Sequence, residues 1–400
     1  MQRATAGLND EIQIIYALAL LLNFFTWRDI MQYREFGKTG CKVSALGFGA
    51  MRLPVIEETG KVDEETAIKM IRDAIDAGVN YVDTAYVYHD GESEVIVGKA
   101  LKDGYREKTY VATKNPVYFA EAKGDFEKYL DEQLKRLDME YIDFYLLHAL
   151  ERATWEGNVL KYDMLESLKK AKEAGKIKHI GFSFHDDLDT FKEIVDAFDW
   201  EFCQIQYNYV NTDYQAGREG LEYAASKGLG VVIMEPMLGG RLAVPPVQVA
   251  KALPDTKTPV EWALDFLWDQ PEVGVVLSGM SLPNQVADNL VYAARSYKGM
   301  VSDEEKEIYL NAKKIFDTMA LVPCTKCRYC MPCPMGIDIP AVYEAYNKTV
   351  SEGMDRAKEC YEKIETNASA CVQCGGCESQ CPQHIMSTEL MPQIDEVFSK

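Results

Sequence analysis

The runs that decide the fold of this chain are YVDTA (81–85), TYVATK (109–114) and IDFYLLH (142–148). Each is a short, nearly continuous series of β-branched, aromatic and other apolar residues, which is typical of strands buried on both faces. The neighbouring stretches 64–78 and 125–139 instead have apolar residues at helical spacing. Together these patterns predict consecutive parallel strands joined by helices.

The same alternation extends in both directions, from Ala45 to about Leu290. Further strands are predicted at LGFG (46–49), HIGFSFH (179–185), FCQIQYN (202–208), VVIMEP (231–236) and GVVLSG (274–279). Eight strands alternating with helices over about 250 residues predict a (β/α)8 TIM barrel. The main alternative is a doubly wound open sheet, which usually carries a G-x-G-x-x-G turn after its first strand. The first strand here reads LGFGAM, which lacks that pattern.

The N-terminal part of the chain contains a short apolar stretch and a predicted hairpin. Residues 12–27 are largely apolar but fall short of the roughly 20 residues that span a bilayer, and acidic residues precede them, unlike in a signal peptide. We expect translation to begin at Met31, so that residues 1–30 are an over-extended start; a surface helix is the alternative. YREFG (33–37) and CKVSA (41–45) predict a hairpin before the first barrel strand.

The composition of the chain restricts its partners. Of its 400 residues, 47% are hydrophobic and 26% are charged, as in soluble globular proteins. The net charge is −20, from 43 basic and 63 acidic side chains. Such a surface repels nucleic acid and anionic membranes, so we expect neither as a partner. With no convincing export signal, we expect a cytoplasmic protein.

Titratable side chains stand at the predicted strand ends, where barrel enzymes carry their active sites. Asp83 ends the second strand, with Tyr88 five residues further on, Lys114 ends the third and His148 ends the fourth. Each has a structural explanation when taken alone, as a helix cap, a solvated strand end or a core histidine. Because the strand ends of one barrel meet in space, their convergence predicts a catalytic site.

The four side chains would act together on a carbonyl group. Lys114 beside Tyr88 is expected to favour the phenolate and to lower the pKa of the tyrosine from about 10. Asp83 would pair with that lysine and orient it. Tyr88 would then serve as a general acid, and His148 would hydrogen-bond the same carbonyl oxygen.

The strings VSALGFGAMRLP, YVDTAYVYHDGESEVIVGKAL, YVATK and YIDFYLLH resemble the aldo-keto reductase family over roughly residues 31–295. The resemblance implies a TIM barrel whose catalytic tetrad is Asp83, Tyr88, Lys114 and His148. It further implies transfer of a hydride and a proton between a nicotinamide cofactor and a small-molecule carbonyl substrate, with Tyr88 as the acid for reduction.

The resemblance also indicates where a nicotinamide would bind. Ser183 and Gln204 match family residues that hold its carboxamide, although Phe184 replaces the asparagine that usually follows the serine. Met234 stands where an aromatic residue often stacks on the nicotinamide ring. These departures leave open that the mouth holds a flavin or another carrier instead.

The expected position of the 2′-phosphate of NADPH lies after the eighth strand. The family commonly supplies a lysine and an arginine there, and this sequence has Gly279 and Gln285 instead, while Asn289 is retained. Because a phosphate is bound best by such cations, NADP and NAD both stay open as the cofactor.

Cysteines are concentrated near the C-terminus, where nine of the eleven lie between residues 324 and 381. The first run, C-x-x-C-x-x-C-x-x-C-P, contains Cys324, Cys327, Cys330 and Cys333. The second, C-x-x-C-x-x-C-x-x-x-C-P, has the spacing of bacterial ferredoxins and contains Cys371, Cys374, Cys377 and Cys381. The segment therefore resembles a two-cluster ferredoxin domain.

In that arrangement the last cysteine of each run ligates the neighbouring cluster. One [4Fe–4S] cluster would be held by Cys324, Cys327, Cys330 and Cys381, and the other by Cys371, Cys374, Cys377 and Cys333. Zinc is the alternative, since paired C-x-x-C motifs also form four-cysteine zinc sites. The remaining Cys41, Cys203 and Cys360 are interpreted as structural or free thiols.

The sequence thus predicts a barrel at 31–300, a linking helix at 301–319 and a small α-rich ferredoxin-like iron–sulfur domain at 320–400, with a helical insert between the cysteine runs. We expect an oxidoreductase that acts on a carbonyl or alcohol, whose clusters exchange single electrons with a flavoprotein or ferredoxin partner. The alternatives are a flavin-dependent electron-transfer enzyme and a scaffold with structural clusters.

Overall fold

The computed structural model describes residues 31–319 and 322–399, and the predicted N-terminal extension at 1–30 lies outside them. Eight parallel strands form a closed barrel in which each strand pairs with the next along the chain and the last pairs with the first. They are β3 (Leu46–Gly49), β4 (Tyr81–Asp83), β5 (Tyr110–Asn115), β6 (Ile142–Leu150), β7 (Ile177–Phe184), β8 (Phe202–Gln206), β9 (Gly230–Met234) and β10 (Val273–Gly279). Each predicted strand overlaps one of these, and the predicted TIM barrel is confirmed.

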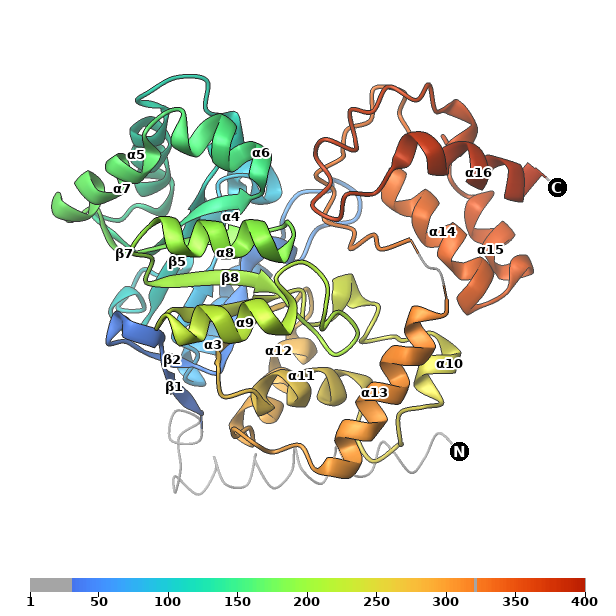
Figure 1. The fold of residues 1–400 in the computed structure, drawn as a ribbon, viewed down its shortest axis with the longest axis horizontal. Helices are drawn as coiled ribbons and strands as arrows, with labels where there is room; N and C mark the ends of the chain where they lie inside the picture. The colour runs from blue at the N-terminus through green and yellow to red at the C-terminus, as the bar shows by residue number, and fades with distance from the viewer. Residues whose placement is uncertain (1–30, 320–321, 400) are drawn as a thin grey trace.

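A helix follows each strand and packs against the outside of the barrel (Figure 1). These are α3 (Glu64–Asp76), α4 (Glu92–Ala100), α5 (Asp125–Leu137), α7 (Met164–Glu173), α8 (Leu188–Ala197), α9 (Gly217–Ser226), α11 (Pro259–Asp269) and α12 (Pro283–Ala294). Shorter helical segments lie in the connecting loops, namely α6 (Arg152–Thr154), η6 (Trp155–Leu160) and α10 (Val247–Ala250). The helices and the outward-facing strand residues share one buried apolar cluster, which holds the helices against the barrel.

The predicted hairpin seals the end of the barrel at which the strands begin. Strands β1 (Tyr33–Glu35) and β2 (Lys42–Ser44) pair antiparallel, and Phe36 between them enters the barrel with no exposed surface. Glycines near the start of β9 and β10 make room for its ring, because a Cβ atom at Gly230 or Gly274 would lie 2.6 Å from it. The opposite end, where the strands finish, is the mouth.

The chain continues from the barrel through α13 (Asp303–Asp317) into a C-terminal domain. That domain contains α14 (Ile339–Ser351), α15 (Met354–Tyr361) and α16 (Ser387–Ser399) around a small apolar core of its own. The first cysteine run precedes α14 and the second precedes α16, and the predicted helices of the insert are present as α14 and α15. The two cysteine loops therefore lie next to the N-terminal ends of α14 and α16.

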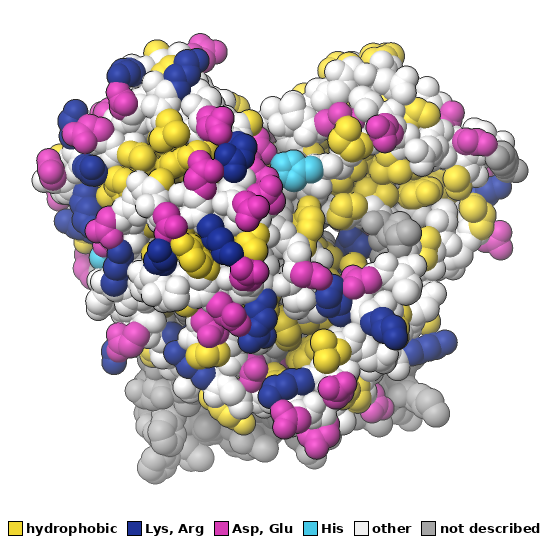
Figure 2. Space-filling model, viewed as in Figure 1, with side chains coloured by type: hydrophobic (Ala, Val, Ile, Leu, Met, Phe, Trp, Pro, Cys, Tyr) yellow, Lys and Arg dark blue, Asp and Glu magenta, His cyan; other side chains and the backbone are white. Residues whose placement is uncertain are grey.

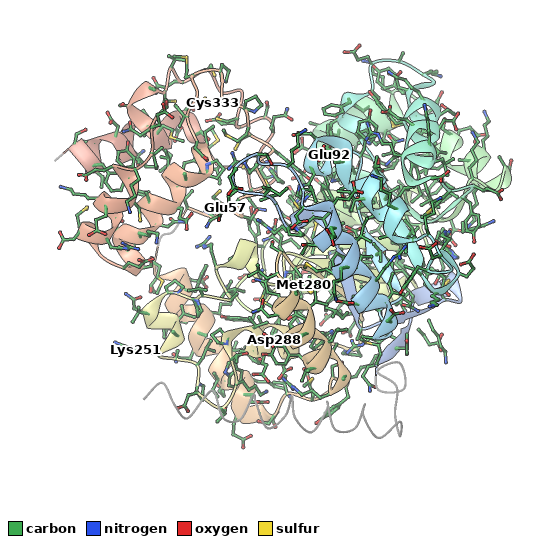
Figure 3. All side chains as sticks on the ribbon, turned by 180° about the vertical axis from the view of Figure 1, so that it is seen from behind. Glu57, Glu92, Lys251, Met280, Asp288 and Cys333 are labelled. Carbon is green, nitrogen blue, oxygen red and sulfur yellow. The ribbon has the colours of Figure 1, made fainter. Side chains whose placement is uncertain are left out.

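The C-terminal domain docks on the barrel mouth. Nη2 of Arg52, just after β3, donates to the carbonyl oxygen of Thr325 at 2.7 Å, and Nε2 of His384 lies 2.9 Å from the carbonyl oxygen of His185, just after β7. Apolar side chains gather on the domain beside the barrel, whereas charges of both signs are scattered over the barrel (Figure 2). From behind, Glu57 marks the β3–α3 loop that reaches toward this domain (Figure 3). The cysteine segment thus covers the mouth.

Candidate active site and cluster-binding cysteines

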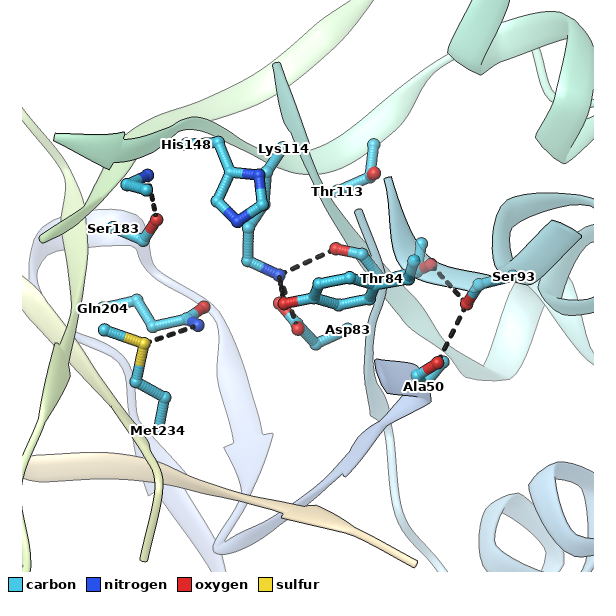
Figure 4. Close-up of polar contacts among 12 residues, drawn as sticks. Ala50, Asp83, Thr84, Ser93, Thr113, Lys114, His148, Ser183, Gln204 and Met234 are labelled. Carbon is cyan, nitrogen blue, oxygen red and sulfur yellow. Dashed lines mark hydrogen bonds and ion pairs between the residues drawn. The ribbon is translucent and has the colours of Figure 1, made fainter. Parts of the chain in front are cut away.

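Adjacent strands bring the predicted tetrad together at the mouth. Asp83 ends β4, Lys114 lies near the end of β5, His148 lies in β6, and Tyr88 begins the 3-10 segment after β4. All four side chains are buried. Figure 4 shows Asp83, Lys114 and His148 converging from neighbouring strands. Parallel pairing in register is what places these residues, distant in sequence, at one depth of the barrel.

Lys114 is the centre of the contacts within this group. Its Nζ donates to Oδ1 of Asp83 at 2.6 Å and to the carbonyl oxygen of Thr84 at 2.7 Å. The same Nζ lies 3.4 Å from the Tyr88 hydroxyl and 4.9 Å from the centre of its ring. An ammonium group held in this way stabilises negative charge on the phenol oxygen.

Burial dominates the electrostatics of the ion pair. It lowers the pKa of Lys114 and raises the pKa of Asp83, and the attraction between the two groups opposes both shifts. Because each group supplies the counter-charge of the other, the pair keeps its charges in an interior that would neutralise either alone.

The expected lowering of the pKa of Tyr88 is wrong for this structure. Burial raises the pKa of Tyr88 well above its ordinary value, Asp83 and Tyr118 raise it further, and a hydrogen bond with Tyr329 opposes these effects. The main reason is the burial of the phenol, and the second is the nearby Asp83 carboxylate, which lies closer to the lysine than the phenol does. Tyr88 therefore rests as a neutral phenol that still carries its proton.

His148 is held neutral between two tyrosines. Burial lowers the pKa of His148 well below its ordinary value, with Lys114 and His185 adding to the shift. The Tyr118 hydroxyl lies 3.3 Å from Nδ1 and the Tyr329 hydroxyl lies 3.4 Å from Nε2. If Tyr118 donates to Nδ1, the ring proton is on Nε2, which then points a donor toward the space beside Tyr88.

Residues predicted to bind the nicotinamide carboxamide lie on the other side of the mouth, where Figure 4 shows Ser183, Gln204 and Met234. Oγ of Ser183 accepts from the backbone N–H of Ala149 at 2.7 Å, which leaves its own proton to donate. Nε2 of Gln204 lies 3.5 Å from Sδ of Met234, while its Oε1 is buried and unpaired among the described residues. An unpaired acceptor beside a free hydroxyl proton fits a carboxamide, which both donates and accepts.

Phe184, which replaces the family asparagine, does not face the mouth. Its ring lies 5.0 Å from that of Phe191 on α8, on the outer side of the barrel. Side chains alternate along a strand, so Ser183 points inward and Phe184 outward. The substitution therefore adds to the core and contributes nothing polar to the site.

The predicted phosphate-binding positions have other contacts. Oε1 of Gln285 accepts from the backbone N–H groups of Ser281 and Leu282 and so caps α12. Nδ2 of Asn289 donates to Oγ of Ser278 at 3.0 Å. A Cβ atom on Gly279 would lie 3.3 Å from the side chain of Arg52, so that arginine fills the space beside the glycine. The structure brings no lysine or arginine from α12 to this place among the described residues.

Two cavities lie among the cysteines, and each contains residues of both runs. A small one is lined by three members of the first run together with the third and last cysteines of the second, namely Cys324, Cys327, Cys330, Cys377 and Cys381. The other, of about 390 Å³, is lined by Cys330, Cys333, Cys371, Cys374 and Cys377. The last cysteine of each run thus faces the cavity of the other run, as ligation of two clusters requires.

The backbone of the two runs follows the same path. Lys326 and Gln373 both have positive φ and donate N–H bonds of 3.4 Å to Sγ of the cysteine two residues before them. Arg328 and Gly375, at matching positions, also have positive φ. Such turns direct N–H groups toward sulfur. Burial raises the pKa of the Cys327 thiol to about 12, and nearby acidic groups raise it further. A thiolate at this position would therefore need a bound cation, such as the iron of a cluster, to stabilise its negative charge. The residues fit iron–sulfur clusters.

The other three cysteines are free thiols. Cys203 is buried in β8 and Cys360 is partly buried in α15. Cys41 Sγ lies 3.5 Å from Nε2 of His179 near the closed end of the barrel. None of the three lines either of the two cavities among the cysteine runs.

Tyr118 and Tyr329 complete the surroundings of the tetrad and were not predicted. Tyr118 lies in η5 (Val117–Phe119), after β5, and Tyr329 lies between two cysteines of the first run. Periodicity and spacing carry no signal for either. Only the docking of the cysteine segment shows that Tyr329 reaches His148.

Comparisons with known proteins agree with both the barrel and the cysteine-rich domain. Residues 45–246 match the model of the aldo/keto reductase family, and residues 323–386 match that of a 4Fe-4S dicluster domain. L-galactose dehydrogenase of Arabidopsis thaliana is 30% identical over 298 residues, which span 69% of this chain and 92% of that protein. The aldo-keto reductase YhdN of Bacillus subtilis is 33% identical over 175 residues, or 41% of this chain and 51% of that protein.

Solved structures show the same barrel. The holo form of aldo-keto reductase AKR11C1 from Bacillus halodurans superposes with a TM-score of 0.61 and 25% identity, covering 70% of this chain and 96% of that one. A thermostable aldo-keto reductase, Tm1743, in complex with epalrestat gives 0.60 and 25%, covering 70% and 100%. Within the described residues, no helix has the length and apolar character needed to cross a membrane.

Proposed function

This chain belongs to the aldo/keto reductase family, and on that premise we propose that its barrel interconverts a small-molecule carbonyl compound and the corresponding alcohol. In the direction of reduction, Tyr88 gives its proton to the carbonyl oxygen as the carbonyl carbon receives a hydride. Oxidation of the alcohol is the reverse, with Tyr88 taking the proton back. A nicotinamide cofactor bound at the mouth would supply the hydride for reduction and would accept it in oxidation.

The observation that carries this proposal is the position of Lys114 between Asp83 and Tyr88. Its ammonium group lies 3.4 Å from the Tyr88 hydroxyl and is fixed by Asp83 at 2.6 Å. Tyr88 rests as a neutral phenol, and the lysine charge stabilises the phenolate that forms as the proton leaves. His148, neutral in this site, adds a hydrogen bond to the carbonyl oxygen through Nε2.

The nicotinamide carboxamide would be held by Ser183 and Gln204, whose free donor and unpaired acceptor match its two ends. Asn289 is the remaining candidate near the other end of the cofactor. Because Gln285 caps its helix and Gly279 has no side chain, the structure supplies no family-type cation for a 2′-phosphate at those positions. We therefore propose a nicotinamide cofactor whose binding does not depend on a family-type cation at these two positions.

We also propose that the eight cysteines of the two runs ligate two [4Fe–4S] clusters in the crossed arrangement that the cavities indicate. Each cluster would carry single electrons between the enzyme and a cytoplasmic redox partner. A hydride moves two electrons at once, whereas a cluster takes one, so a flavoprotein is the partner whose chemistry fits best. The match to a dicluster domain favours this assignment over zinc.

Replacing the proposed acid tests the barrel chemistry. We expect Tyr88→Phe in the cluster-loaded enzyme to lower kcat for 4-nitrobenzaldehyde reduction by roughly 100- to 10,000-fold, as for loss of a general acid. Turnover is followed without oxygen by loss of NADH or NADPH absorbance, which also reports the preferred cofactor. Tyr297→Phe, at a tyrosine that is 61% exposed, is the matched control and should keep full activity. Undiminished turnover by Tyr88→Phe contradicts the assignment.

The role of the clusters is tested by their visible absorbance. We expect NADH or NADPH alone to leave the oxidised clusters unbleached, and a flavoprotein reductase added with the nicotinamide to bleach them. Rapid bleaching by a nicotinamide alone would show that electrons reach the clusters without a flavin and would contradict the proposed partner.

A further inference from the structure

The hydroxyl of Tyr329 occupies a specific place in the active site. It lies 3.4 Å from Nε2 of His148, and it is close enough to the hydroxyl of Tyr88 for each phenol to influence the pKa of the other. The rings of Tyr329 and His148 meet edge to face, with centres 6.2 Å apart. The phenol of Tyr329 therefore lies beside Tyr88 and His148, the two side chains that are proposed to act on the substrate oxygen.

A substrate carbonyl needs the same two partners. Its oxygen must accept from the hydroxyl of Tyr88, the proposed proton donor, and from Nε2 of His148. The hydroxyl oxygen of Tyr329, 3.4 Å from Nε2 of His148 and close to the hydroxyl of Tyr88, stands where such a carbonyl oxygen would lie. The side chain of Tyr329 and a reacting carbonyl are thus alternative occupants of one position.

A cavity of about 480 Å³ lies on the outer side of Tyr329. Its walls include aromatic residues of the barrel loops and residues of the second cysteine run, among them Tyr86, Tyr118, His185, Tyr329, Gln380 and Pro382. Neither Tyr88 nor His148 is part of its lining. Tyr329 and Tyr118, whose hydroxyls both lie near His148, therefore stand between this cavity and the tetrad. The cavity is large enough for a ring-sized molecule.

The cysteine run itself does not call for an aromatic residue here. Cys327-Arg328-Tyr329-Cys330 matches Cys374-Gly375-Gly376-Cys377, and the two turns share their positive φ values and their N–H bonds to sulfur. The position of Tyr329 is therefore a glycine in the second run. The contacts of the Tyr329 side chain with His148 therefore point to a role in the barrel site rather than in the cysteine run.

We propose that Tyr329 is a specificity-determining residue that fills the carbonyl position in the resting enzyme and admits only carbonyl compounds whose carbon skeleton fills the outer cavity. A ring-sized carbonyl compound gains enough contact in that cavity to displace the phenol. A short aliphatic aldehyde reaches the same oxygen position but gains little in the cavity, so it is selected against. This inference rests on the proposed role of Tyr88.

Removing the hydroxyl of Tyr329 tests the competition. In the cluster-loaded enzyme, Tyr329→Phe should lower KM for 4-nitrobenzaldehyde by about fivefold, as expected when the weak hydrogen bonds that hold the closed position are lost. Its kcat should stay within about twofold of the parent. A large fall in kcat with unchanged KM would instead make Tyr329 a proton donor and overturn the proposal, as would unchanged values of both.

Removing the whole ring tests the selection. Tyr329→Gly, which copies Gly376 of the second run, should lower KM for propanal more than KM for 4-nitrobenzaldehyde, so that the preference for the larger aldehyde shrinks. An unchanged ratio overturns the proposed selectivity. Tyr346→Phe, at a partly buried tyrosine of α14, is the control and should alter neither KM. Iron content and visible absorbance verify that each variant keeps its clusters.

A binding measurement keeps the test independent of turnover. Calorimetric titration with 4-nitrobenzamide, an aromatic carbonyl compound that this chemistry does not reduce, should give a Kd about fivefold lower for Tyr329→Phe than for the parent protein. Equal affinity, or no binding to either protein, overturns the competition. Failure of the proposed function is distinct, because it appears as undiminished turnover by Tyr88→Phe whatever happens at Tyr329.

Discussion

The ammonium group of Lys114 lies 2.6 Å from Oδ1 of Asp83, and the two side chains are 0% and 3% exposed. Burying this pair removes both charges from water, so each depends on the other for compensation. The same contact sets the chemistry, because Asp83 aims the lysine at Tyr88 while reducing its influence on the resting phenol. The position of the Lys114 ammonium group and its effect on Tyr88 thus both depend on the ion pair with Asp83.

Replacing one partner of that ion pair should lower the free energy of unfolding more than replacing both partners. We expect Lys114→Met to destabilise the barrel by about 3–5 kcal/mol, because it leaves the Asp83 carboxylate buried without a counter-charge. The double variant Lys114→Met/Asp83→Asn should recover much of that loss. Urea unfolding followed by tryptophan fluorescence measures both, and strictly additive effects of the two substitutions would contradict the coupling.

Two adjacent glycines after β9 test the docking of the cysteine segment. Gly239 and Gly240 have φ of 67° and 96°, so alanine at either is strained. A Cβ atom at Gly239 would in addition lie 2.5 Å from the carbonyl oxygen of Thr325, whereas one at Gly240 meets nothing within 4 Å. We expect Gly239→Ala to be less stable than Gly240→Ala by about 1–3 kcal/mol. It should also speed amide exchange at residues 322–330, and equal exchange in the two variants would argue against this contact.

The crossed ligand sets predict which cysteine removes which cluster. Cys333, at the end of the first run, lines the cavity of the second. Cys333→Ser should therefore lower the iron content from two clusters to one and spare the cluster of Cys324, Cys327 and Cys330. Cys360→Ser, at a free thiol in the same domain, should change nothing. Anaerobic iron and sulfide determination decides the matter, and full iron content in Cys333→Ser would exclude it as a ligand.

A buried carboxyl group beneath the cysteine segment predicts a pH dependence of stability. Burial raises the pKa of Glu235 from 4.5 to about 7, with Thr325 and Arg52 opposing the shift. The folded protein therefore keeps a proton that the unfolded chain loses. The resulting stabilisation is fully present below the unfolded pKa and is lost as the pH rises through the folded one. Over that interval the loss is about 3 kcal/mol, from 1.36 kcal/mol per pKa unit.

Replacing Glu235 with glutamine should remove this dependence, because the amide keeps the shape of the protonated acid and does not titrate. We expect the Tm of the parent protein to fall more between about pH 5 and pH 8 than the Tm of Glu235→Gln. The variant should be the more stable of the two at the upper end. Parallel Tm curves for the two proteins would show that Glu235 is not the group responsible.

The sequence by itself determined the barrel, the convergence of four titratable groups and the two cysteine runs. Strand periodicity is local, and parallel strands of one barrel must end at one mouth, so Asp83, Lys114 and His148 could be placed together from their positions at strand ends. Cysteine spacing is equally local, because three sulfurs two residues apart can reach one cluster without help from the rest of the chain.

Only the tertiary structure decided what surrounds those groups. The raised pKa of Tyr88 follows from burial and from Asp83 lying nearer the lysine than the phenol does, and neither distance can be read from spacing. The contact of Tyr329 with His148 joins residues 181 positions apart and on different domains. It depends on how one domain docks on the other, which is set by the shape and polarity of two folded surfaces and by no pattern within either segment.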